Sequence, residues 1–197
     1  MQAPILKSKK NLKKTLKMMQ DPEIELWAMD EVTLQLHGTT CKMWIAPENS
    51  DPVVYHNPVR KSVKYYGAVR LRDGKFVYQR EEDKFNGDSC KRFLKFLRKI
   101  TAPSSKKAII LTDNARYHHA RIHKDWREAC NKKFPLEFLP PYSPELNPIE
   151  RVWRFTRRTC THNRYFPTLD QLSAAVEPQF DQWRYGSKQM QRLCVIS

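Results

Sequence analysis

Three acidic residues occupy positions at which this sequence could assemble a metal site. Asp30 and Asp113 each end an apolar, strand-like run, and Glu150 opens a helical pattern after a proline-rich connector. Functional side chains of sheet proteins gather at strand ends and helix starts, so we expect these carboxylates to converge. Neighbouring carboxylates raise one another's pKa, and a hard divalent cation relieves their repulsion. Two such cations about 4 Å apart would support phosphodiester cleavage.

Each carboxylate also has a purely structural interpretation. Glu150 lies three residues after Asn147, with Pro148 at the first helical position, and this spacing is typical of a capping box. Asp113 precedes a helical pattern and could form an Asx-turn there. Asp30 is followed by Glu31 and carries no distinctive local pattern. Local spacing therefore leaves the structural and the metal-binding interpretations open.

The elements that must position these acids can be predicted from periodicity and turn residues. The pattern predicts an α/β fold with a mixed sheet flanked by helices, in one domain at 22–197 preceded by a basic arm at 1–21. An Asp-Gly turn at Asp73-Gly74 predicts a hairpin. We expect strands at 25–30, 32–36, 40–46, 63–71, 75–80, 107–112 and 136–139, and helices at 87–100, 118–131, 149–162 and 169–183.

Charge indicates the class of partner. The chain has 197 residues, and 36 Lys and Arg against 21 Asp and Glu give a net charge of +15. Such an excess favours a polyanion, because neutralised phosphates release counterions. We predict DNA rather than a membrane, because no apolar run approaches the ~20 residues that span a bilayer and no signal peptide is recognisable.

Cysteine and glycine usage narrows the function further. The five cysteines are scattered, odd in number and lack a C-x-x-C pair, which favours a reducing compartment over a disulfide framework. The histidines at 118, 119 and 123 near Cys130 fit no common zinc spacing. No glycine-rich phosphate loop is present, so ATP- and NAD-dependent chemistry are poorly supported.

Three segments, in this order, resemble the catalytic domain of DDE transposases. They are Trp-Ala-Met-Asp-Glu at 27–31, Ile-Leu-Thr-Asp-Asn-Ala-Arg-Tyr-His-His-Ala at 110–120, and Leu139 through Glu150 followed by Arg-Val-Trp. The last contains Ser-Pro-Glu-Leu-Asn-Pro-Ile-Glu, which is highly specific for the mariner-type superfamily and its bacterial insertion-sequence branch. The resemblance extends over roughly residues 22–185.

The resemblance implies an RNase H-like fold and an acidic triad of Asp30, Asp113 and Glu150 that binds two Mg²⁺ ions, for which Mn²⁺ can substitute. It implies cleavage at transposon ends and transfer of the freed 3′-hydroxyl to target DNA. The second and third acids are separated by 36 residues, slightly more than is usual. Glu145 is not the implied metal ligand, and Glu31 is an accessory acid at most.

DNA contacts are expected from basic residues close to the triad. The expected phosphate-binding residues are Arg116, His119, Arg151, Arg154, Arg157 and Arg158. The alternatives are solvated charge for the four later arginines, and core or capping roles around Arg116. We expect Trp153, one turn beyond Glu150, to be a core residue that anchors the helix.

The resemblance also indicates partners. Relatives carry a helix-turn-helix region for end recognition, which is missing here, so we expect a fragment or a split-gene product with a separate helix-turn-helix subunit. A dimer or higher assembly on DNA in a prokaryotic cytoplasm, associated with the nucleoid, is implied. The alternatives are a catalytically silent DNA-binding protein derived from a transposase and a plain RNase H-like nuclease.

Overall fold

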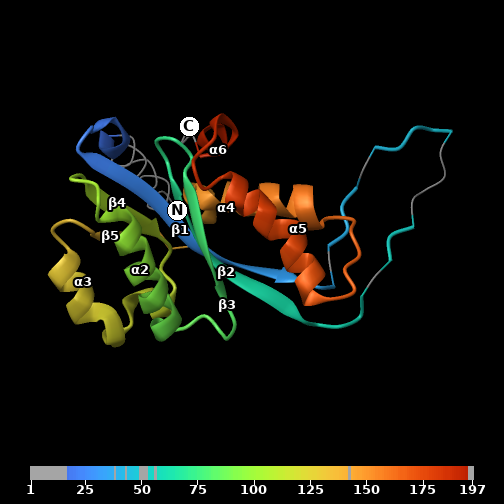
Figure 1. The fold of residues 1–197 in the computed structure, drawn as a ribbon, viewed down its shortest axis with the longest axis horizontal. Helices are drawn as coiled ribbons and strands as arrows, with labels where there is room; N and C mark the ends of the chain where they lie inside the picture. Colours follow the sequence, from blue (N-terminus) through green and yellow to red (C-terminus); the bar gives the residue numbers. More distant parts are fainter. Residues whose placement is uncertain are drawn as a thin grey trace, which may run out of the picture.

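The fold is built on one mixed five-stranded sheet. The computed structural model describes residues 17–37, 39–42, 44–48, 53–55, 57–141 and 143–194. The strand order is β3-β2-β1-β4-β5 (Figure 1), in which β1 pairs antiparallel with β2 and parallel with β4. The strands are β1 (Ile24–Gln35), β2 (Ser62–Arg70), β3 (Phe76–Glu81), β4 (Lys107–Thr112) and β5 (Leu136–Phe138).

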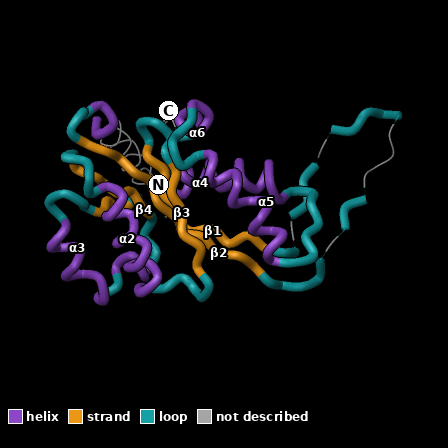
Figure 2. The backbone as a smooth tube through the Cα atoms, viewed as in Figure 1, coloured by secondary structure: helices purple, strands orange, loops and turns teal. Residues whose placement is uncertain are grey.

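Helices cover both faces of this sheet (Figure 2). Side chains of α4, α5 and α6 join one buried cluster, and those of α2 and α3 pack in a second cluster on the opposite face. The α-helices are α2 (Gly87–Thr101), α3 (Lys124–Cys130), α4 (Ile149–Thr156), α5 (Leu169–Gln182) and α6 (Lys188–Leu193). Shorter helical turns are η1 (Arg116–His119), η2 (Arg121–His123), η3 (Pro144–Leu146) and the π-helical η4 (Arg157–Thr161).

The alternation of β1 divides its side chains between the two clusters. Leu26 and Ala28 pack with α4 and α5, whereas Trp27 and Met29 pack with α2. Because side chains alternate along a strand, the consecutive acids Asp30 and Glu31 emerge on opposite faces of the sheet. They therefore enter different environments.

The structure confirms the mixed sheet and its hairpin, in which Gly74 at the turn has a φ of +72°. The expected break between 25–30 and 32–36 is wrong, because β1 runs unbroken for 12 residues. The expected helix at 118–131 consists of two short 3₁₀ turns followed by α3. Helix α6 was not predicted.

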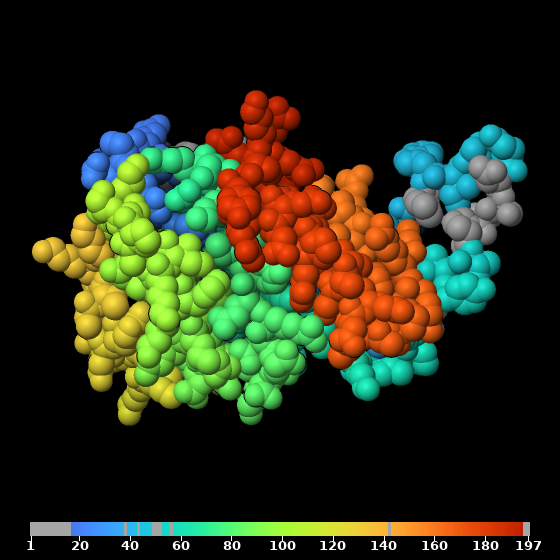
Figure 3. Space-filling view, viewed as in Figure 1, coloured from blue at the N-terminus to red at the C-terminus, as the bar shows by residue number. Residues whose placement is uncertain are grey.

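The strand expected at 40–46 is also wrong for the described residues, where the pairing is a single bridge from Thr39 to His162. The described parts of this segment extend away from the body (Figure 3), and Trp44 is fully exposed. A strand requires a neighbouring strand along its length, and the described part of this segment has no strand partner beyond that bridge; the N–H of Cys41 donates to the side chain of Asn163 at 2.8 Å.

Most of the basic arm expected at 1–21 lies outside the described residues. The described part includes residues 17–20, which are helical. Within the described ranges, no helix is long and apolar enough to cross a membrane. All five cysteines are unpaired.

Candidate active site

The parallel register of β1 and β4 aligns two of the three acids. Ile24 pairs with Lys107 and Ala28 with Leu111. The same register, continued two residues further, places Asp30 level with Asp113. Asp30 therefore lies inside β1, and not at its end as expected, but it lies just beyond the last residue that pairs with β4.

The third acid reaches the same place through the seating of α4. Trp153 is buried, and a Cβ added to Gly67 would lie 2.4 Å from its Cη2 atom. Gly67 is the residue of β2 that pairs with Asp30. The bare backbone at Gly67 thus allows the indole ring to lie close to the sheet beside Asp30. Glu150, three residues before Trp153, is thereby carried to the same region.

A cavity of about 440 Å³ joins the three acids. Asp30 is buried, Asp113 is largely exposed and Glu150 is half-buried. The cavity is lined by Asp30, Asp113, Asn114, Ala115, Leu139, Pro140, Pro141, Ser143, Pro144, Asn147 and Glu150. The structure therefore brings the three predicted acids together around one space.

The electrostatic environments of the two aspartates differ. Burial raises the pKa of Asp30 to about 8, and the neighbouring charges of Glu31, Glu150 and Asp113 add to the effect. A hydrogen bond from His118 lowers the pKa of Asp113, against the opposing effect of its partial burial. One aspartate thus tends to hold a proton, while the other is held as a carboxylate.

The two structural alternatives have different outcomes. The capping box at Glu150 is absent, because α4 begins with Pro148 at its N-cap and has no side-chain capping bond. The Asn147 side chain instead donates to the carbonyl oxygen of Met29 at 3.3 Å. The Asx-turn is present, since the backbone N–H of Ala115 donates to Asp113 Oδ1 at 3.0 Å. This Asx-turn does not prevent the Asp113 side chain from lining the cavity.

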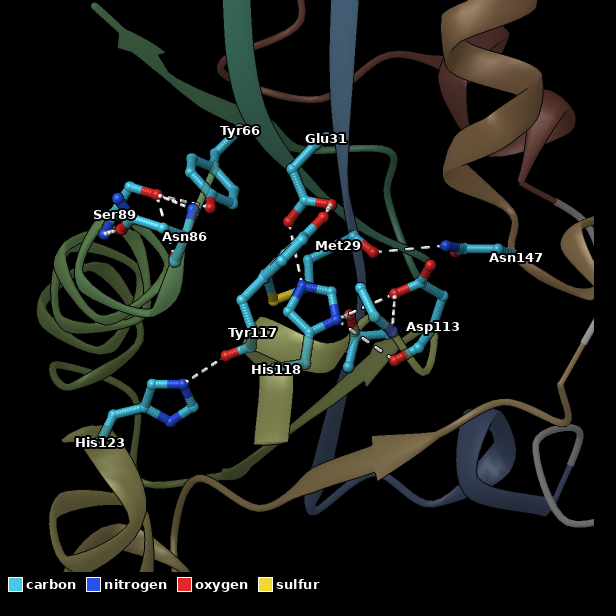
Figure 4. Close-up of polar contacts among 12 residues, drawn as sticks. Met29, Glu31, Tyr66, Asn86, Ser89, Asp113, Tyr117, His118, His123 and Asn147 are labelled. Carbon is cyan, nitrogen blue, oxygen red and sulfur yellow. Dashed lines mark hydrogen bonds and ion pairs between the residues drawn. The ribbon is translucent and has the colours of Figure 1, made fainter. Parts of the chain in front are cut away.

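His118 is the residue of this region whose place the sequence did not indicate. Its position after Asp113 suited a contact with the DNA strand and a core or capping role equally, and its side chain is fully buried between Glu31 and Asp113 (Figure 4). Burial alone lowers the pKa of His118, but its bonds to Asp113 and Glu31 outweigh burial and raise the pKa to about 10. The sequence shows a histidine shortly after Asp113, but it does not show which way the side chain of that histidine points.

The donors at the cavity fit a hard divalent cation. They are carboxylate oxygens, which Mg²⁺ and Mn²⁺ prefer, and Asn147 adds a buried Oδ1 atom that has no hydrogen-bond partner among the described residues. In the described part of the chain, no three His, Cys, Asp or Glu side chains are close enough to hold a metal. At least one of the three carboxylates would therefore have to move toward the others for them to share an ion.

Residues 25–173 match the family model described as DDE superfamily endonuclease. The chain belongs to this DDE family. Among curated proteins it is 38% identical over 65 residues to a Sinorhizobium fredii protein, y4pE/y4sA, covering 33% of this chain and 44% of that protein. It is 30% identical over 89 residues to a 39 kDa protein of insertion element IS630 from Shigella sonnei, covering 44% and 26%. The chain thus spans less than half the length of these curated relatives.

Solved structures of the Mos1 transposase share the fold of this DDE domain. The Mos1 mariner paired-end complex with Mn matches at a TM-score of 0.68 and 17% identity, covering 96% of this chain and 56% of that chain. The Mos1 strand transfer complex matches at 0.66 and 17%, covering 96% and 55%. These matches confirm the RNase H-like fold.

The arginines of the DDE domain after Glu150 fall into distinct environments. Arg154 and Arg158 are exposed, whereas Arg157 is half-buried. Arg151 donates to the carbonyl oxygen of Leu193 at 3.2 Å and so ties α4 to the C-terminal helix. A second cavity of about 520 Å³ adjoins the first and is lined by Pro144, Glu145, Asn147, Glu150, Arg151 and Arg154.

Arg116 and His119 lie in η1, which directly follows the lining residues Asp113, Asn114 and Ala115 in the chain. Arg116 is exposed. His119 stacks on Phe138 at 4.1 Å between ring centroids, and its Nε2 lies 3.3 Å from Asn114 Oδ1. Arg116 is therefore available to a ligand, and His119 has a packing role in addition to any contact with DNA.

Proposed function

We propose that this chain is the catalytic unit of a DDE transposase. It would cleave DNA at transposon ends and direct the attack of the freed 3′-hydroxyl on target DNA. The observation that carries this proposal is the convergence of Asp30, Asp113 and Glu150 around one cavity in a domain of the DDE endonuclease family. In support, the Mos1 structures that share the fold include a paired-end complex with a transposon end and a strand transfer complex.

The proposed cofactor is Mg²⁺, with Mn²⁺ as a substitute and two ions per site. Asp30, Asp113 and Glu150 would hold them, and in support the Mos1 paired-end complexes include one with Mn and one with Mg. When bound, such ions activate a water and stabilise the leaving oxygen of a phosphodiester. A silent relic of a transposase would lack this acid-dependent uptake of metal.

The protein residues would divide the remaining tasks. Asp30 is fixed by β1, and Asp113 by the turn that follows β4, so both present their carboxylates from rigid backbone. Glu150 approaches from α4. Arg154, in the adjoining cavity, would hold a phosphate of the same strand, because it is exposed and lies one turn beyond Glu150. Arg116, His119, Arg157 and Arg158 are the further proposed DNA contacts.

The assembly belongs to the same proposal. We place the catalytic domain at 22–197 and assign 1–21 to a basic arm, with a separate helix-turn-helix segment or subunit for end recognition. Joining two transposon ends requires two catalytic units, which implies a dimer or higher assembly on DNA. The compartment we propose is the cytoplasm of a prokaryote, on the nucleoid.

A matched pair of glutamates tests the catalytic assignment. Glu145 and Glu150 lie in the same motif, but Glu145 is exposed and does not line the cavity shared by the three acids. We expect Glu150→Gln to slow Mn²⁺-dependent nicking of supercoiled plasmid more than about 100-fold. Glu145→Gln should remain within about threefold of the wild type. Nicking by Glu150→Gln at the wild-type rate would show that the triad is wrongly assigned.

A second assay separates transposase from plain nuclease. A labelled DNA duplex with a free 3′-hydroxyl is supplied together with plasmid and Mn²⁺. We expect a joined product that disappears in Glu150→Gln and persists in Glu145→Gln. Nicking without any joined product would favour the RNase H-like nuclease instead.

A further inference from the structure

His118 links Asp113, which lines the cavity, to Glu31, which faces the opposite side of the sheet from Asp30. It lies in η1, five residues after Asp113, and its imidazole is shielded completely from solvent. Its Nδ1 lies 2.9 Å from Asp113 Oδ1, and its Nε2 lies 3.0 Å from Glu31 Oε1 (Figure 4). Carboxylates only accept hydrogen bonds, so both ring nitrogens donate.

The contact with Asp113 uses one side of its carboxylate. Oδ1 accepts from His118 Nδ1 and from the backbone N–H of Ala115 at 3.0 Å. Among the described residues, Oδ2 has no hydrogen-bond or ion-pair partner. Two donors on one oxygen fix the rotation of the carboxylate, and this leaves Oδ2 free for a ligand in the cavity that Asp113 lines.

Glu31 holds the imidazole from the far side. It follows Asp30 on β1 but points to the opposite face, where its side chain is only 7% exposed. Its second oxygen, Oε2, accepts from the hydroxyl of Tyr117 at 2.8 Å. Glu31 therefore lacks access to the cavity of the three acids, and its role is to orient His118.

We propose that His118 is a positioning residue of the metal site, which presents Asp113 Oδ2 to the cation while Glu31 and Tyr117 hold the imidazole in place. The inference rests on the proposed function, because it requires Asp113 to be a metal ligand. It adds a chain of contacts that crosses the sheet from Tyr117 to the cavity. Partners that orient a ligand change metal affinity by about 10- to 100-fold when removed.

Two substitutions of His118 separate its two contacts. The side-chain amide nitrogen of asparagine takes nearly the place of Nδ1, and that of glutamine nearly the place of Nε2. His118→Asn therefore keeps a donor toward Asp113, whereas His118→Gln keeps one toward Glu31. Both variants lose the ring. His118→Gln also loses the contact of Nδ1 with Thr112 Oγ1 at 3.0 Å, so the free energy of unfolding is measured for each variant.

The measurement is Mn²⁺ affinity by calorimetry at fixed pH, with the free energy of unfolding measured in EDTA alongside. We expect His118→Gln to weaken Mn²⁺ binding about tenfold and His118→Asn about threefold or less. Equal weakening by both, or greater weakening by His118→Asn, overturns the inference. If neither variant folds, Tyr117→Phe carries the test: weaker Mn²⁺ binding by the folded variant supports the inference, and unchanged affinity overturns it.

Glu150→Gln separates this inference from the proposed function. Wild-type Mn²⁺ uptake that does not depend on Glu150 overturns the proposed function and the inference together. Uptake that is lost in Glu150→Gln but is insensitive to the choice between the two His118 variants overturns the inference alone.

Discussion

Asp30 is a carboxyl group that folding places almost out of contact with water, at 8% exposure. Nothing in the described structure donates to its side chain strongly enough to offset burial, so the pKa of Asp30 rises to about 8. In the unfolded chain the same carboxyl has its ordinary pKa of 3.8. Folding therefore keeps a proton on Asp30 at pH values where the unfolded chain has released it.

This difference gives the stability of the metal-free protein a definite sign with pH. The contribution of Asp30 is fully present below pH 4 and is lost as the pH rises toward 8, because unfolding then releases a proton. We expect Asp30→Asn to be increasingly more stable than the wild type between pH 5 and pH 8. The upper limit is about 1.4 kcal/mol per pH unit. Denaturant unfolding in EDTA measures it, and a constant difference would contradict it.

The three acids could be predicted from the sequence because each lies in a segment that resembles the DDE transposases. Sequence reasoning could not place His118, since its partner Glu31 is 87 residues away and the contact depends on which side of β1 each acid faces. That side is decided by the register and continuity of β1, and two strands, at 25–30 and 32–36, were expected in place of one. The position of His118 could therefore not be predicted, because the sequence did not reveal that β1 is continuous.

Among the elements, those with a strong local pattern were predicted well. The β4 run is buried from Ala108 to Thr112 and matches its expected bounds, and α2 follows its apolar stripe. The segment at 40–46 has a strand-like composition but lacks a neighbouring strand. The residues after Asp113 form 3₁₀ turns, because His118 and His123 are drawn inward to Asp113 and to the Tyr117 carbonyl oxygen.

Helix α4 depends on a glycine in a different element. An alanine Cβ at Gly67 would overlap the Trp153 ring, so Gly67→Ala must displace the ring, and we expect α4 to move away from the sheet with it. We expect a loss of about 1–3 kcal/mol in the free energy of unfolding. We also expect weaker Mn²⁺ binding, since Glu150 moves with the helix. Denaturant unfolding and calorimetry measure the two effects.

The control is a double-mutant cycle with Trp153→Phe, which removes the indole atoms that lie closest to Gly67. Gly67→Ala should cost less in the Trp153→Phe background than in the wild type. An equal cost in both backgrounds would mean that the overlap is not what the substitution creates, and that α4 is positioned by other contacts.

Across the whole molecule, charge is distributed unevenly. The chain carries a net charge of +15, yet three acids gather at one cavity. A polyanion would be attracted by the surface and repelled by the cavity unless cations occupied it. Binding and cleavage should therefore separate, with DNA affinity set by the arginines and catalysis by the carboxylates.

The arginines of α4 provide the test of that separation. Arg154 is exposed beside the cavities, whereas Arg151 is bonded to Leu193 and holds the C-terminal helix. We expect Arg154→Ala to weaken DNA binding and to reduce the slope of log affinity against log salt by about 1, with unchanged unfolding. Arg151→Ala should lower the free energy of unfolding by about 1–2 kcal/mol. Fluorescence anisotropy at several salt concentrations measures the slope. If the slope is unchanged in Arg154→Ala, the DNA strand does not pass over the start of α4, and the basic surface that binds it lies elsewhere on the chain.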